Sequence, residues 1–536
     1  MRILRIVSLM IRELITSREL TYKILANLLF MRVLGNRELN YQEVKSKLKY
    51  LFRCRQEKFM KKINNSSTNK ALFKNTGIIA IGQISTKIVN FLLLPLYTAL
   101  LSTEEYGLVD LLTTYSSLIV VIIGLQINQA VFRFLVTSRE DEKRLKEITS
   151  TVILETGVVF IGYTILFLII QPFITVSYKW YLLIHVIASI YLQTVAGISR
   201  GLGQNGIYAT GNFISAFMMI ILNVLFIAIM KLGVGAMLIA YVIGPFIGGS
   251  YIAIRTKIWK FFDIKFANKK DMKMVMNYAI PLVPNELSWI VIHSSDRMII
   301  SAFLSVAING LIAVAAKIST IYTTIFSIFN TSWTEQVVLH YKDEGGAEYV
   351  CEMFDKMITF FATIAIGIIA SIPLVFPFLV NQSFKDAYDL IPWYMIAVFF
   401  NAVIGMISAI YLIENETKQV AVSTMFAALI NVVVDLLCVK VIGMYAAPIS
   451  SICGYMVVSF WRVWDVNKRH CRIIMSWKKI VGLMIMLIIS MSSFYSRNFS
   501  VEILSLALII VGALRINYSF LREFIQIFIK KENRRD

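Results

Sequence analysis

The most constraining feature of this chain is a series of apolar runs, each about 20 residues long, that recurs through most of its length. A run of that length crosses the roughly 30 Å hydrocarbon core of a bilayer as an α-helix. Spanning β-strands would instead show segments of about 10 residues with alternating polarity. Of the 536 residues, 57% are hydrophobic and only 16% are charged. The pattern therefore predicts an all-α, polytopic membrane protein.

From Asn75 onward the apolar runs predict about 14 transmembrane helices. Their approximate limits are 75–100, 108–133, 151–172, 180–200, 207–230, 233–255, 277–303, 309–334, 357–380, 388–412, 417–438, 441–464, 479–496 and 499–517. We group them into a first six-helix lobe (75–255), a second six-helix lobe (277–465) and two added C-terminal helices (479–517). Residues 1–70 are predicted to be a basic amphipathic extension, and residues 518–536 a basic cytoplasmic tail.

An internal repeat supports the division into lobes. A shift of 203 residues places LSTEEYGL, which begins at Leu101, on LSVAINGL, which begins at Leu304. A shift of about 210 residues aligns KLGVGAMLIAYVIG, from Lys231, with the stretch that begins at Val439. Because each copy holds an even number of spans, both copies start on the same side of the membrane. The repeat therefore predicts pseudo-twofold symmetry about an axis along the membrane normal.

The distribution of basic residues predicts the orientation. Lys and Arg concentrate in the loops after the second, sixth and twelfth spans, whereas the opposite loops carry one basic residue or none. By the positive-inside rule, the basic loops and both termini face the cytoplasm. The net charge of +20 is explained by this topology and by anionic lipid headgroups, so no nucleic-acid partner is expected.

One predicted span, Asn277 to Leu304, combines an apolar helix with many polar and ionisable residues. At 100° per residue, six of them share about one third of the helix circumference. These six are Asn285, Glu286, Trp289, His293, Asp296 and Arg297. Ionisable residues at bilayer depth are costly and usually mark a substrate or ion path. The alternative is that Asp296 and Arg297 only pair with other helices to hold the bundle together.

Other predicted spans carry polar residues that would complete such a path. In the first span the repeat places Gln83 over Glu286 and Asn90 over His293, with Lys87 on the same face, and Lys317 begins a polar seam on the eighth span. Secondary candidates are Asp110, Arg133, Glu335 and Asp435. Arg133 and Glu335 lie near the predicted membrane surface, where anchoring is the commoner role. No metal-ligand spacing and no nucleophile and base pair stands out, so neither a metal site nor an enzyme is expected.

The sequence also resembles a known family. Asn75 to Leu135 resembles the opening of bacterial polysaccharide flippases of the Wzx type, and Pro281 to Ile300 is similar to the seventh helix of that family. These flippases belong to the multidrug/oligosaccharidyl-lipid/polysaccharide exporter (MOP) superfamily, which includes the MATE transporters. The resemblance covers about residues 70–520. It implies that the cationic groups of the family's central cavity are Lys87, Arg297 and Lys317.

The resemblance implies a function and a location. It implies alternating access that flips an undecaprenyl-pyrophosphate-linked oligosaccharide across the bacterial cytoplasmic membrane for surface polysaccharide synthesis. No cofactor is expected, and a proton or sodium gradient is the candidate driving force. The expected partners are the lipid-linked oligosaccharide, membrane lipids and other polysaccharide-assembly proteins. The alternatives are a cation-coupled multidrug exporter of the same superfamily and, less favoured, a membrane glycan polymerase, which would need a longer outward loop or soluble domain.

Overall fold

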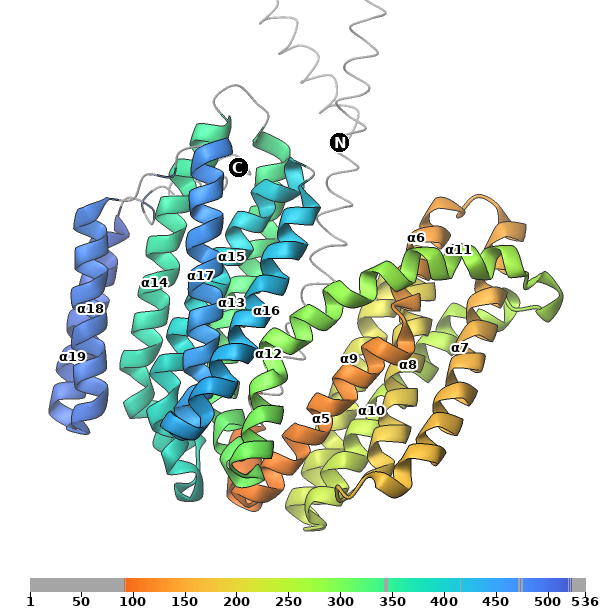
Figure 1. The fold of residues 1–536 in the computed structure, drawn as a ribbon, viewed down its shortest axis with the longest axis horizontal. Coiled ribbons are helices and arrows are strands. Elements are labelled where there is room, and N and C mark those ends of the chain that lie inside the picture. Colours follow the sequence, from red (N-terminus) through yellow and green to blue (C-terminus); the bar gives the residue numbers. More distant parts are fainter. Residues whose placement is uncertain are drawn as a thin grey trace, which may run out of the picture. The chain divides into compact units, whose positions relative to one another are not determined.

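A computed structural model describes residue 91, residues 93–341, 346–414, 416–470, 473, 476–518, and residues 520 and 522. Every regular element in this part of the chain is helical, and it contains no β-strand (Figure 1). This confirms the all-α prediction. The expected N-terminal extension (1–70) lies outside the described residues, as do the first part of the first span and nearly all of the expected tail.

The first lobe contains seven α-helices among its described residues, because the second predicted span is divided in two. They are α4 (Leu94–Leu100), α5 (Thr103–Gly124), α6 (Ile127–Thr137), α7 (Glu142–Ile170), α8 (Trp180–Gly201), α9 (Asn205–Asn223) and α10 (Gly233–Thr256). Within the lobe α10 packs on α8 and α9, and α8 packs on α6. A further amphipathic helix, α11 (Lys269–Ala279), follows the lobe and packs against α6 and α7 (Figure 1).

The second lobe begins after the 3-10 turn Ile280–Leu282. Its helices are α12 (Val283–Phe303), α13 (Val306–His340), α14 (Gly346–Leu379), α15 (Ile391–Ile413), α16 (Thr417–Ile442) and α17 (Ala446–Arg469). Here α12 packs on α16, and α17 packs on both α15 and α16. The two added helices, α18 (Trp477–Ser496) and α19 (Phe499–Ile516), pack on each other and on α14 (Figure 1).

The helices agree with the expected number of spans. Eleven described segments are long and apolar enough to cross a membrane, and one of them, Lys418–Arg469, contains both α16 and α17. The charged helix α12 is not among the eleven, although at 21 residues it is about 31 Å long. With α12, the described residues thus hold thirteen of the 14 predicted spans, and the remaining one, the first, lies mostly outside the described residues.

The second predicted span, 108–133, is wrong in one respect. The structure divides it into α5 and α6 at Leu125 and Gln126, whose φ angles of 48° and 58° lie in the left-handed region. Two consecutive left-handed residues cannot continue a right-handed α-helix. The apolar character of the sequence continues across the break, so hydropathy did not reveal it.

The internal repeat is visible where the lobes meet. Ser102 caps the N-terminus of α5, and its repeat equivalent Ser305 caps α13. The equivalent residues Gly107 and Gly310 face each other across the contact between these helices. A Cβ on Gly107 would lie 2.0 Å from the carbonyl oxygen of Val306, and one on Gly310 would lie 2.0 Å from that of Thr103. The reciprocal contact shows that the pseudo-twofold axis passes between α5 and α13.

Candidate functional site

The six polar and ionisable residues that share one face of the predicted span 277–303, here called the ionisable stripe, lie on α12. This helix is shorter than the predicted span. Pro281 and Pro284 explain the shortening, because proline lacks a backbone N–H and favours the first turn of a helix. The 3-10 turn Ile280–Leu282 precedes α12, and Pro284 lies in its first turn. On α12, Asp296 is buried at 5% exposure, whereas Glu286 and Arg297 are half-buried and His293 is exposed.

Arg297 joins the two lobes. Its Nε lies 2.8 Å from Oδ2 of Asp110 on α5 of the first lobe. The two atoms are close enough for an ion pair, yet Nε has no aligned hydrogen-bond acceptor. Nη1 of Arg297 donates to the carbonyl oxygen of His293 at 3.0 Å and to Oγ of Ser294 at 3.4 Å. The guanidinium is therefore held by its own helix while its charge faces the carboxylate of the other lobe.

Two residues of α13 extend this contact between the lobes. Nδ2 of Asn309 donates to the carbonyl oxygen of Gly107 at 3.0 Å and lies 3.5 Å from Oδ2 of Asp110. Lys317 is half-buried, and its charged neighbours are Asp110 and Arg297. With Asp296, which neighbours Arg297, the structure thus gathers two cationic side chains and two carboxylates where the lobes meet.

Aromatic side chains lie beside the same stripe. The rings of Trp289 and His293 stack with their centroids 5.8 Å apart and an interplanar angle of 15°. The hydroxyl of Tyr455 on α17 lies 2.9 Å from Nδ1 of His293, with the donor set by the imidazole tautomer. Flat rings next to cations are a common surface for sugars and for the polar heads that carry them.

A second polar cluster lies where α12 meets α16. The hydroxyl of Tyr394 donates to Oδ2 of Asp296 at 3.2 Å. Asp435 is fully buried, and neither of its carboxylate oxygens has a hydrogen-bond partner among the described residues. One turn away, Asn431 accepts a hydrogen bond from Ser295 at 2.9 Å. A buried carboxylate without a partner is costly unless it holds a proton or a cation.

The predicted site residues fall into three groups. Asp110, Asp296, Arg297 and Lys317 come together, with His293 one turn from Arg297 and Asp435 across the contact between α12 and α16. Arg133 lies apart, with its guanidinium 4.8 Å from the ring centroid of Tyr278 on α11. Glu286 is on α12 but makes none of these contacts. Gln83, Lys87, Asn90 and the side chain of Glu335 lie outside the described residues.

Asn309, Tyr394 and Tyr455 were not predicted as site residues. All three are uncharged and lie in apolar runs, so a search for intramembrane charge passes over them. A weak signal was present for Asn309, because it lies inside the repeated block LSVAINGL beside Gly310. Nothing comparable marks the two tyrosines, whose contacts with Asp296 and His293 depend on how the helices pack.

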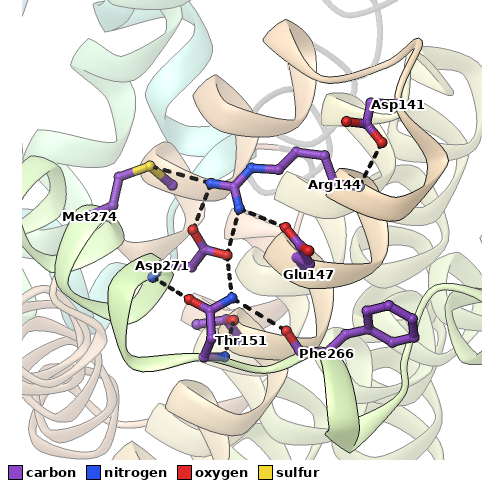
Figure 2. Close-up of polar contacts among 8 residues, drawn as sticks. Asp141, Arg144, Glu147, Thr151, Phe266, Asp271 and Met274 are labelled. Carbon is purple, nitrogen blue, oxygen red and sulfur yellow. Dashed lines mark hydrogen bonds and ion pairs between the residues drawn. The ribbon is translucent and has the colours of Figure 1, made fainter.

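A separate ion pair fastens α11 to the first lobe (Figure 2). Nη1 and Nη2 of Arg144 on α7 bind the carboxylate of Asp271 at 2.7 and 2.6 Å. Asn268 donates to the same carboxylate at 2.7 Å, and Glu147 accepts from Arg144 at 2.9 Å. Burial of Asp271 opposes its ionisation, but the hydrogen bonds from Arg144 and Asn268 outweigh it and hold the pKa of that carboxyl below its ordinary value.

Comparisons with known proteins agree with this architecture. Residues 72–334 match a family described as polysaccharide biosynthesis protein. The fold is similar to a solved structure of the lipid II flippase MurJ in an inward closed conformation, with a TM-score of 0.66 and 16% identity, covering 83% of this chain and 99% of MurJ. The likeness to MurJ shows a shared fold, and the family match covers residues 72–334 of this chain.

MATE transporters of the MOP superfamily share the fold as well. An inward-facing structure matches with a TM-score of 0.59 and 14% identity, covering 72% of this chain and 95% of the transporter. An outward-facing one matches with a TM-score of 0.53 and 15% identity, covering 74% and 95%. No curated protein sequence shows significant similarity to the chain. The fold is therefore one that multi-pass membrane transporters have.

Proposed function

We propose that this transporter flips an undecaprenyl-pyrophosphate-linked oligosaccharide from the cytoplasmic to the outer leaflet of the bacterial cytoplasmic membrane. The observation that carries the proposal is the ion pair between Arg297 of the second lobe and Asp110 of the first, 2.8 Å apart. A charge buried between two lobes is costly to keep. It is useful where the lobes must separate and a charged substrate must enter between them.

Competition for Arg297 gives a mechanism for opening. Because its Nε has no aligned acceptor in Asp110, a pyrophosphate with several charged oxygens makes a better partner for the guanidinium. Lys317 adds a second cation, and the Trp289 and His293 rings offer a stacking surface for the first sugar. Substrate binding would therefore replace the contact between the lobes, while the lipid tail stays in the bilayer.

The comparisons favour this substrate over the alternatives. The matched family is described by polysaccharide biosynthesis, and MurJ is named as a flippase of lipid II. The MATE structures keep a multidrug exporter as the second candidate. That candidate predicts altered drug resistance on overexpression and unchanged surface glycan. Two other expectations stay predictions. One is the orientation with both termini in the cytoplasm, and the other is that further partners are polysaccharide-assembly proteins.

Charge reversal at Arg297 tests the proposal. Arg297→Glu should abolish surface glycan export in a flippase-null strain, because it repels both Asp110 and the pyrophosphate, while the amount of protein in the membrane stays unchanged. The matched control is Arg515→Glu, an exposed arginine at the end of α19 that makes no ion pair with the described residues. Full export by the Arg297 variant would rule out the proposed role.

We also propose that transport is coupled to a proton or sodium gradient through Asp435. The support is its fully buried carboxylate, which lacks a partner among the described residues, next to the hydrogen-bonded Asp296 across the contact between α12 and α16. Asp435→Asn keeps the shape and removes the charge. Transport into vesicles with an imposed pH or sodium gradient should be accelerated for the wild type and insensitive to the gradient for the variant. An equal response of both proteins would exclude Asp435 as the coupling group.

A further inference from the structure

A cluster of lysines lies outside the site, in the segment that joins the lobes. We call residues 257–273 the basic segment; it runs from the end of α10 into the first turns of α11. Its six lysines are all exposed: Lys257, Lys260, Lys265, Lys269, Lys270 and Lys273. Only Asp263 and Asp271 oppose them, and Arg144 already neutralises Asp271. None of the six makes an ion pair with a described residue, so their charge is available to a partner.

Exposed apolar side chains lie between these lysines. Trp259 is 58% exposed, Phe262 is 38% exposed and Ile264 is 65% exposed. In water such side chains would be unfavourable, whereas aromatic rings beside ammonium groups are typical of the membrane interface. The membrane span α10 ends at Thr256, immediately before the basic segment. The segment therefore starts at the level of the lipid headgroups.

The backbone of the basic segment is fixed to the first lobe. Ser150 on α7 donates through Oγ to the carbonyl oxygen of Phe261 at 3.3 Å and accepts from the backbone N–H of Asp263 at 2.9 Å. The carboxylate of Asp263 accepts from the backbone N–H of Lys265 at 3.0 Å. Ile258 is buried beneath the segment at 8% exposure. The exposed lysines and aromatic rings therefore lie on a segment whose backbone is fixed to the first lobe.

We propose that the basic segment is a docking surface for anionic phospholipid headgroups of the leaflet that faces the basic loops. Lysine ammonium groups bind the headgroup phosphates, while Trp259, Phe262 and Ile264 insert at the boundary with the acyl chains. The basic segment includes the start of α11, which Arg144 ties to the first lobe and which leads into α12. Lipid bound here fixes the connection between the lobes at the membrane surface, independently of which substrate the site carries.

Lipid retention by the purified full chain tests this inference. The triple variant Lys257→Gln, Lys260→Gln and Lys265→Gln is compared with wild type after exposure to equal amounts of phosphatidylglycerol and phosphatidylcholine, with bound lipids counted by native mass spectrometry. We expect wild type to prefer phosphatidylglycerol. In the variant, the ratio of bound phosphatidylglycerol to bound phosphatidylcholine should fall several-fold. The amount of bound phosphatidylcholine should stay unchanged. Replacing the same three lysines by arginine should preserve the preference, because the charge remains.

A matched control separates a local surface from the general positive charge of the protein. Lys143→Gln, Lys468→Gln and Lys478→Gln remove the same charge from exposed lysines elsewhere, and none of these lysines makes an ion pair with a described residue. This variant should retain phosphatidylglycerol as wild type does. Equal losses in the two glutamine variants, or undiminished retention in the first, would overturn the inference.

Discussion

At the scale of single residues, the sharpest test concerns Asp271, which is only 1% exposed and bound by Arg144 through both of its carboxylate oxygens. Asp271→Asn keeps the shape but removes the charge that holds the guanidinium. Because hydrogen bonds to charged groups contribute roughly 1.5–3 kcal/mol, we expect a lower melting temperature for the purified variant at neutral pH. Glu142→Gln is the control, since its pair with Lys146 is exposed and should contribute almost nothing.

The difference in melting temperature between wild type and Asp271→Asn should also depend on pH. The pKa of Asp271 is lower in the folded chain than its ordinary value of 3.8. The ionised carboxyl therefore stabilises the fold above the ordinary pKa, and this contribution disappears as the pH falls through the lowered value. The advantage of wild type over Asp271→Asn should be constant from neutral pH down to about pH 5 and shrink below about pH 4. An advantage that grows on acidification would contradict this assignment.

At the scale of elements, the contact of α5 with α13 predicts a change of conformation. A Cβ on Gly107 would lie 2.0 Å from a backbone oxygen of α13, so Gly107→Ala must push the two helices apart on the side opposite the basic loops. We expect faster labelling of a Ser117→Cys reporter by an impermeant thiol reagent added from that side. Gly157→Ala on α7 is the control, because nothing lies within 4 Å of its added Cβ. Unchanged labelling in the Gly107 variant would show that this contact does not close the side opposite the basic loops.

Part of this arrangement of helices could be predicted from the sequence alone. Apolar length predicted the spans, and the repeat of 203 residues predicted that α5 and α13 are equivalent, which the caps Ser102 and Ser305 confirm. The break at Leu125 and Gln126 was not predictable, because it is a change to left-handed backbone conformation inside an apolar run. Helical periodicity placed Asp296 and Arg297 on one face. It could not identify Asp110 as the partner, because that depends on how the two lobes pack.

At the scale of the whole molecule, two lobes meet at Gly107 and Gly310, and the described residues of the two lobes share the charged contact between Arg297 and Asp110. Arg297 and Asp110 join the lobes. In the proposed mechanism, the pyrophosphate of the substrate would take the place of Asp110 on binding. The lobes would then rock about the pseudo-twofold contact, as expected for a transporter built from two repeats. Flipping and glycan export should therefore depend on the same arginine.

The most direct measurement reconstitutes the purified protein in liposomes that hold an undecaprenyl-pyrophosphate-linked oligosaccharide in both leaflets. A glycosidase added outside digests only the oligosaccharide of the outer leaflet, so flipping raises the digested fraction above about one half. We predict nearly complete digestion with wild type and about one half with Arg297→Glu, as in protein-free liposomes. Digestion that stays at one half with wild type, or becomes complete with the variant, would contradict the account.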